Sequence, residues 1–364
     1  NHSAPYYVIA NTSDSAVKAV NQAIRQGKKV YLTDDGYIVD TPTFENLLGD
    51  YAIYGDALYK VPNGPSLKAL KVYSPPHQFY WAGVDSPTHT ALALKNLGFD
   101  LVDTPEEADV VVLESNNFDK SLVGLKPTIV VGGSAMQRLE KLGLIDGFNA
   151  EKFSGGSDFE GLMKAIIDDQ DPLTSGYNKN DLFYSNSGNW IAKAPANFKT
   201  LATIAGSDYY IAGWWPGNEK LANKIVAISG KYNENPLFVY AGNPTNRLHT
   251  IHFYRWISNA VFGSQLANLT DYILPSPTPN PIPQPQPLTP PTYQAPSKTY
   301  QAPNQTRLDF KPATKVDPVQ EIPLTYSRDS LPKTGTQEMT EGFKLASILI
   351  ACSAGLFLLK KKED

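Results

Sequence analysis

Proline spacing divides this chain into a part that can fold and a part that cannot form a packed core. Fifteen of the 29 prolines lie between Pro275 and Pro332, and every second residue from Pro275 to Pro287 is a proline. Alternating prolines favour an extended, polyproline-like backbone that buries no hydrophobic core. We therefore expect a folded region over residues 1–274 and a disordered, proline-rich linker over residues 275–330.

Three sequence elements follow the linker within residues 331–364. A pentapeptide and a short polar stretch precede an uncharged apolar run over residues 345–359, which ends at three lysines. The run predicts a C-terminal membrane helix, although its 15 residues are fewer than the about 20 of a permanent span. The lysines favour the cytoplasmic side of the bilayer. The pentapeptide consists of Leu331, Pro332, Lys333, Thr334 and Gly335.

This arrangement resembles the cell-wall sorting signal of Gram-positive surface proteins, in which a sortase cleaves an LPxTG pentapeptide. The resemblance covers residues 331–364 and implies a secreted protein anchored to the cell wall, with residues 275–330 as a wall-spanning linker. A sortase thiolate would attack the carbonyl of Thr334, release residues 335–364 and transfer the acyl group to an amine of a peptidoglycan precursor. The implied partners are sortase, peptidoglycan joined through Thr334, and the membrane during a transient insertion.

The composition and the first residues of the sequence limit which partners the protein can bind and which chemistry it can perform. The formal net charge is −4, so no basic surface for nucleic acid is expected. The single cysteine, Cys352, lies in the apolar run, which leaves residues 1–334 without a disulfide or a cysteine nucleophile. The sequence begins at Asn1 without an initiator methionine or signal peptide, and because export requires a signal, we expect a segment upstream of Asn1.

Residues 1–66 predict a small α+β unit. Apolar runs over residues 6–10 and 29–33 predict strands, and residues 13–26 between them predict a helix. This order gives a strand-helix-strand unit. The glycine- and tyrosine-rich stretch that follows predicts short strands and turns up to about residue 65.

Residues 67–274 predict a larger α/β domain. Its strand candidates are residues 67–73, 99–102, 110–113, 128–131, 201–204, 222–228 and 237–240. Helices are predicted over residues 87–97 and 136–142, and a closing helix over residues 247–262. Continuous apolar strands such as Val110–Leu113 favour a parallel sheet that is buried on both faces. The alternation of strands and helices therefore predicts a doubly wound, mostly parallel sheet.

Three short phrases resemble the noncatalytic C-terminal region of some bacterial secreted zinc carboxypeptidases. They are Ala-Gly-Trp-Trp-Pro-Gly-Asn at 212–218, Gly-Asn-Pro-Thr-Asn-Arg at 242–247, with Asn259-Ala260 on the helix behind it, and the opening pattern within residues 7–27. The resemblance covers residues 1–265 and implies a fold like that of class I glutamine amidotransferases, which is flavodoxin-like. It also implies an accessory role, to support or position a peptidase domain encoded upstream of Asn1.

The chain departs from the catalytic pattern of those enzymes. A zinc carboxypeptidase site needs a His and a Glu three residues apart and a distant His. The chain's histidines are His2, His77, His89, His249 and His252, and none is followed by Glu at that spacing. We expect no metal or cofactor in this chain, and zinc would belong to a catalytic domain upstream.

Ser134 is the one candidate nucleophile. It occupies the strand-to-helix turn where an amidotransferase needs a cysteine, in a phrase that lacks the second glycine of a G-x-S-x-G elbow. A hydrolase that uses Ser134 with His249 or His252 is one interpretation. The other is structural, with Gly132 and Gly133 permitting a tight turn and Ser134 capping the following helix.

Tryptophans are the remaining candidates for a binding surface. Trp81, Trp214 and Trp215 fall in predicted loops or at strand ends, where their rings could stack on sugars or peptide aromatics. Buried packing is the alternative for each of them. Adjacent residues of a strand point to opposite faces, so we expect one ring of the pair Trp214 and Trp215 to be exposed. A glycan- or protein-binding adhesin module therefore stands beside the accessory role and the Ser134 hydrolase.

Overall fold

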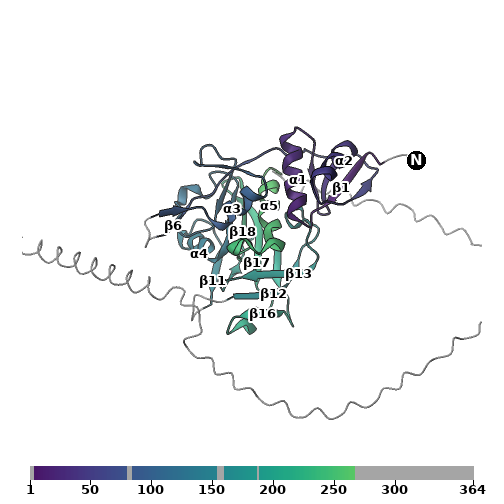
Figure 1. The fold of residues 1–364 in the computed structure, drawn as a ribbon. Coiled ribbons are helices and arrows are strands. Elements are labelled where there is room, and N and C mark those ends of the chain that lie inside the picture. The colour runs from purple at the N-terminus through teal and green to yellow at the C-terminus, as the bar shows by residue number, and fades with distance from the viewer. Residues whose placement is uncertain (1–3, 80–83, 154–159, 187, 267–364) are drawn as a thin grey trace, which may run out of the picture. The chain divides into compact units, whose positions relative to one another are not determined.

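The computed structural model describes residues 4–79, 84–153, 160–186 and 188–266 (Figure 1). The predicted linker at 275–330, the sorting signal and the apolar run at 345–359 lie outside the described residues. Within the described ranges, no helix is both long enough and apolar enough to cross a membrane.

A four-stranded antiparallel sheet with two helices forms the first part of the fold. Its elements are β1 (Tyr6–Ala10), α1 (Asp14–Arg25), β2 (Tyr31–Leu32), β3 (Gly36–Asp40), α2 (Thr41–Asp50) and β4 (Gly55–Leu58). The order is β2-β3-β1-β4, so the predicted strand-helix-strand unit is present with β3 inserted between its two strands. The expectation of only short strands and turns in this stretch is wrong, because Thr41–Asp50 form helix α2. It forms because Asp40 accepts a hydrogen bond from the Thr43 N–H and a proline lies in its first turn.

A mixed sheet of twelve strands, with a separate two-stranded hairpin, makes up the second part (Figure 1). Neighbours in the block β8-β5-β9-β10-β18 run parallel, and the other strand pairs are antiparallel. The strands of the sheet are β5 (Lys71–Tyr73), β8 (Asp100–Val102), β9 (Val110–Leu113), β10 (Thr128–Val131), β11 (Asn149–Lys152), β12 (Glu160–Ile167), β13 (Asn180–Ser185), β14 (Asn189–Lys193), β15 (Lys199–Ile204), β16 (Tyr210–Trp214), β17 (Ile225–Tyr232) and β18 (Asn235–Tyr240). The hairpin consists of β6 (His77–Phe79) and β7 (Val84–Ser86).

Helices cover both faces of the parallel block. They are α3 (His89–Asn96), α4 (Gly132–Leu142) and α5 (Tyr254–Gly263), with single 3₁₀ turns η1 (Lys120–Leu122), η2 (Pro172–Thr174), η3 (Asn218–Lys220), η4 (Asn246–Leu248) and η5 (Ile251–Phe253). Phe238 and Tyr240 of β18 stack on Trp256 of α5. Val239 points to the opposite face, where it is also fully buried, and α4 contacts β18. The predicted α/β fold is therefore present, with an antiparallel extension beyond β18.

The closing helix is shorter than predicted. Arg247 and Leu248 adopt left-handed backbone conformations, with φ of 49° and 61°, so a helix cannot run through them. Helix α5 begins at Tyr254 instead. His249 and His252 consequently do not share one face of a helix.

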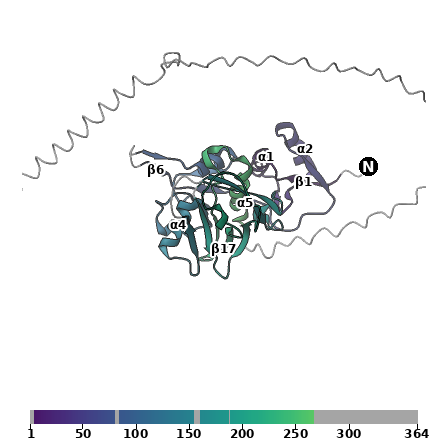
Figure 2. The same ribbon diagram turned by 90° about the horizontal axis from the view of Figure 1, so that it is seen from below.

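The two sheets lie next to each other (Figure 2). They share one hydrophobic core, which contains a buried polar joint. Asn11, which follows β1, donates from Nδ2 to the Ser175 carbonyl at 3.1 Å and to Asn259 Oδ1 at 2.8 Å. Asn259 in turn donates to the same Ser175 carbonyl at 2.9 Å. Rings of Tyr37 and Phe262 pack edge to face beside this joint. Asn259 belongs to the carboxypeptidase-like phrases. Its hydrogen bonds to Asn11 and to the Ser175 carbonyl give it a structural role where the two sheets meet.

Candidate functional site

A cavity of about 440 Å³ opens where strands β9, β10 and β18 end. Glu114 directly follows β9, Gly132 directly follows β10, and Asn243 lies three residues beyond β18. The carboxyl ends of parallel strands are where open α/β sheets bind ligands, and the volume suits a small molecule. The cavity is lined by His77, Ser86, Pro87, Thr88, His89, Leu92, Glu114, Ser115, Asn116, Gly132, Gly133, Ser134, Asn186, Asn243 and Asn246.

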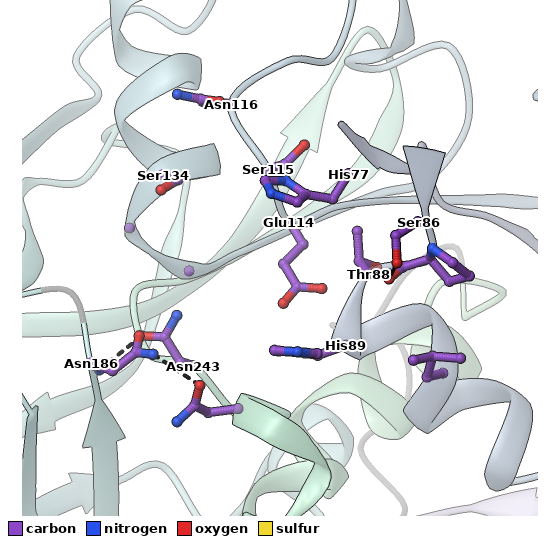
Figure 3. Close-up of a pocket in the computed structure, with 15 residues that line it drawn as sticks. His77, Ser86, Thr88, His89, Glu114, Ser115, Asn116, Ser134, Asn186 and Asn243 are labelled. Carbon is purple, nitrogen blue, oxygen red and sulfur yellow. Dashed lines mark hydrogen bonds between the residues drawn. The ribbon is translucent and has the colours of Figure 1, made fainter. Parts of the chain in front are cut away.

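Glu114 brings a carboxylate into the cavity. Figure 3 shows its carboxyl group directed into the space between His77 and His89. Its Oε2 accepts a hydrogen bond from the Thr90 N–H at 2.9 Å, at the start of α3. The positive end of a helix dipole stabilises a negative charge at this position. The first turn of α3 therefore fixes the orientation of Glu114.

Three asparagines that line the cavity form a connected network, and Figure 3 shows two of them, Asn186 and Asn243, next to each other. The Asn186 N–H donates to Asn243 Oδ1 at 3.0 Å, and Asn186 Nδ2 donates to Asn246 Oδ1 at 2.9 Å. Asn246 Nδ2 donates to the Tyr184 hydroxyl, which donates to Glu160 at 2.7 Å. Burial and the Glu160 carboxylate raise the pKa of Tyr184 to about 12, so the phenol keeps its proton. The network fixes the orientation of the Asn186 and Asn246 amides.

Glycine at position 132 leaves room for this network. Its φ is +82°, and a Cβ atom there would lie 3.2 Å from Asn243 Nδ2, which is closer than ordinary contact. Helix α4 starts at Gly132 and has no side-chain cap. The predicted capping role of Ser134 is therefore wrong, because Ser134 is the third residue of α4.

Ser134 lines the cavity, but with different histidines from those proposed. His77 and His89 share the cavity with it, whereas His252 pairs through Nε2 with Asp181 Oδ1 at 2.7 Å. Figure 3 shows the Ser134 hydroxyl pointing away from Glu114. Asp181 lies 71 positions before His252, so sequence spacing does not reveal this pair. In the parts of the chain that the structure describes, no cluster of three or more His, Cys, Asp or Glu residues could hold a metal ion.

The candidate tryptophans occupy different environments. Trp81 lies outside the described residues. Trp214 at the end of β16 is 62% exposed, and Trp215 beside it is 2% exposed. The two rings point to opposite faces as the strand geometry requires. Trp214, and not Trp215, can therefore present its ring to a ligand.

Trp214→Ala is expected to change the free energy of unfolding by less than about 0.5 kcal/mol, because an exposed side chain loses little burial. Urea denaturation of the two proteins measures this difference. A midpoint lowered by several times that energy would contradict the exposed position. Loss of ligand binding on Trp215→Ala would not identify a contact residue, because the same change removes a buried ring from the core.

Comparison with protein families decides where the protein is located. Residues 324–364 match the model described as the LPXTG cell wall anchor motif. The protein is a secreted surface protein, attached covalently to the wall of a Gram-positive bacterium. Sortase is its processing enzyme and peptidoglycan its covalent partner. Comparison with curated proteins gives no match, and the carboxypeptidase resemblance is not confirmed.

Several solved structures are similar to part of this chain at low identity. A protein from Thermoplasma acidophilum, described as a proposed subunit of GMP synthase, is 13% identical, with a TM-score of 0.38, over 56% of this chain and 98% of that one. A cytoplasmic protein from Salmonella typhimurium is 13% identical, with a TM-score of 0.34, over 53% and 98%. A proposed ThuA-like protein from Parabacteroides merdae is 10% identical, with a TM-score of 0.33, over 55% and 90%. Similarity at this level carries no argument about function.

Proposed function

We propose that the folded region is a noncatalytic module that binds a small polar ligand at the cell surface. The observation that carries the proposal is the cavity at the ends of β9, β10 and β18, in which an ordered asparagine network faces the carboxylate of Glu114. Such convergent polar groups in a preformed cavity are typical of a binding site. The orientation of Ser134 away from Glu114 favours binding over a hydrolase that uses this serine.

The composition of the cavity indicates which ligands fit. Its described lining includes neither lysine nor arginine, and Glu114 is its only carboxylate. His89 Nδ1 lies 3.4 Å from the Arg247 backbone nitrogen, a long contact that favours the tautomer with hydrogen on Nε2. Amides, hydroxyls and imidazole N–H groups suit the hydroxyl and amide groups of sugars and peptides. The anchor holds the module among such molecules, because peptidoglycan consists of glycan strands and peptides.

His89→Ala is expected to weaken binding of soluble peptidoglycan fragments by about tenfold, which corresponds to one lost hydrogen bond. The fragments are released from purified walls by a muramidase, and calorimetric titration measures their affinity. His249→Ala is the matched control, since His249 is also exposed but does not line the cavity. Absence of saturable binding to the unaltered protein, or equal losses in both variants, would refute the proposal.

The accessory role in a zinc carboxypeptidase belongs to the same proposal. Two asparagines of the carboxypeptidase-like phrase at 242–247, Asn243 and Asn246, line the cavity. A binding module of this kind would hold substrate near a peptidase domain encoded upstream. Translation of the reading frame upstream of Asn1 tests this role. A domain with the His and Glu zinc spacing would support it, and a signal peptide directly before Asn1 would exclude it.

A further inference from the structure

We propose that the cavity recognises a protonated primary amine, with Glu114 as the residue that contacts it. This inference rests on the proposed binding function and names the chemical group that the site selects. The carboxylate of Glu114 is partly exposed and directed into the cavity (Figure 3). It supplies the one formal negative charge among the described lining residues.

The hydrogen bonding of Glu114 leaves it able to accept a ligand. The Thr90 N–H reaches only Oε2, and a carboxylate has two oxygens with about four acceptor positions. A protonated amine has three donors and no acceptor. One of these donors fits the Glu114 carboxylate, and hydrogen bonds between charged groups are the strong ones.

The charged side chains among the described lining residues favour a cation over an anion. No lysine or arginine among the described lining residues offers a counter-charge to a phosphate or a carboxylate. The Ser115 hydroxyl adds a neutral group that can accept a hydrogen bond, because it donates its own proton to Asn117 Oδ1. An anion in this space would face the charge of Glu114, whereas an ammonium group would be attracted by it.

Two kinds of molecule in a cell wall carry a protonated primary amine. One is an amino sugar with a free amine, and the other is the free amine of a wall peptide. The shared group is the protonated amine, and its acetylated form has the same surroundings without the charge. Acetylation therefore separates recognition of the amine from recognition of the rest of the ligand.

Competition against a bound, fluorescently labelled peptidoglycan fragment provides the test. The competitors are glucosamine and N-acetylglucosamine for the sugar source, and Nα-acetyl-lysine amide and its Nε-acetylated form for the peptide source. We expect the amine of at least one pair to compete about tenfold better than its acetylated partner, and added salt to reduce this preference. Inorganic phosphate is the anion probe and is expected to compete weakly.

Glu114→Gln is the matched variant. Glutamine keeps an oxygen that can accept the Thr90 N–H but has no charge. The variant is expected to lose the preference for the amine, so that an amine and its acetylated partner compete equally well. Its melting temperature shows whether it is folded, and the comparison of competitors in the unaltered protein needs no variant at all.

The outcomes distinguish this inference from the proposed function. Binding of the labelled fragment without any preference for the amine, or a preference for phosphate, would refute amine recognition and leave the binding function intact. A preference that persists in Glu114→Gln would refute the role of Glu114. Absence of saturable binding by the fragment would refute the proposed function itself.

Discussion

Thr334→Ala is expected to reduce the fraction of protein linked to the wall by about tenfold or more. A loss of only about 1.4 kcal/mol in recognition by the sortase gives a factor of ten. Residues 324–364 match the cell wall anchor motif, and the resemblance to a sorting signal implies that the acyl group that sortase transfers belongs to Thr334. The variant should appear in the membrane and medium fractions of an expressing Gram-positive host. Immunoblots of wall, membrane and medium measure this distribution.

Thr336→Ala is the matched control for wall attachment. It makes the same substitution two residues downstream, outside the pentapeptide and within the segment that cleavage releases. Its wall-linked fraction should equal that of the unaltered protein. Lys333→Ala should also be tolerated, because this position of the motif is variable. Equal wall attachment of Thr334→Ala and Thr336→Ala would mean that the protein is held by another route.

Continuous apolar runs and helix caps allowed much of the fold to be predicted. Strands β9 and β10 have the predicted bounds, because strands buried on both faces consist of adjacent apolar residues. Helix α1 begins after Ser13, whose side chain accepts from the Ala16 N–H as a cap should. The signals that predict β9, β10 and α1 therefore lie entirely within the local sequence of each element.

The antiparallel extension could not be predicted in the same way. Strand β12 alternates between more buried and more exposed residues, but apolar Leu162 and Ile166 occupy its more exposed positions. The burial of β12 alternates along the strand, but its sequence does not alternate between apolar and polar residues, so the usual signal of such a strand is missing. Helix α2 had its signals, a cap at Asp40 and an early proline, but many glycines nearby favoured turns.

The candidate site was only partly foreseeable. Ser134 and the turn at Gly132 were singled out from local sequence, and both line the cavity. Asn186 and Asn243 are 57 positions apart, and only the folded sheet brings them together. Glu114 could not be placed in the site from the sequence, because nothing near it in sequence reveals the Thr90 N–H that orients it.

Gly176→Ala is expected to lower the free energy of unfolding by about 3 kcal/mol or more. Gly176 follows the Ser175 carbonyl of the buried polar joint and has a φ of +83°. An alanine Cβ there would overlap the backbone carbonyl oxygen of Asn11 and lie 3.1 Å from Arg255 Cδ. A backbone atom cannot rotate away as a side chain can. To relieve the overlap, the backbone at Asn11 and the backbone at Ser175 must move apart. These two segments join the small sheet to the rest of the fold.

Gly143→Ala separates the clash from the cost of backbone conformation. Gly143 ends α4 with a φ of +60°, and a Cβ atom there would meet nothing within 4 Å. This variant should cost only about 1 kcal/mol, the penalty for a left-handed alanine. Urea denaturation of both variants measures the difference, with an unchanged slope showing that the unfolded states are comparable. Equal losses of unfolding free energy in the two variants would mean that the buried polar joint rearranges at little cost. The contact between Asn11 and Gly176 would then not hold the two sheets together.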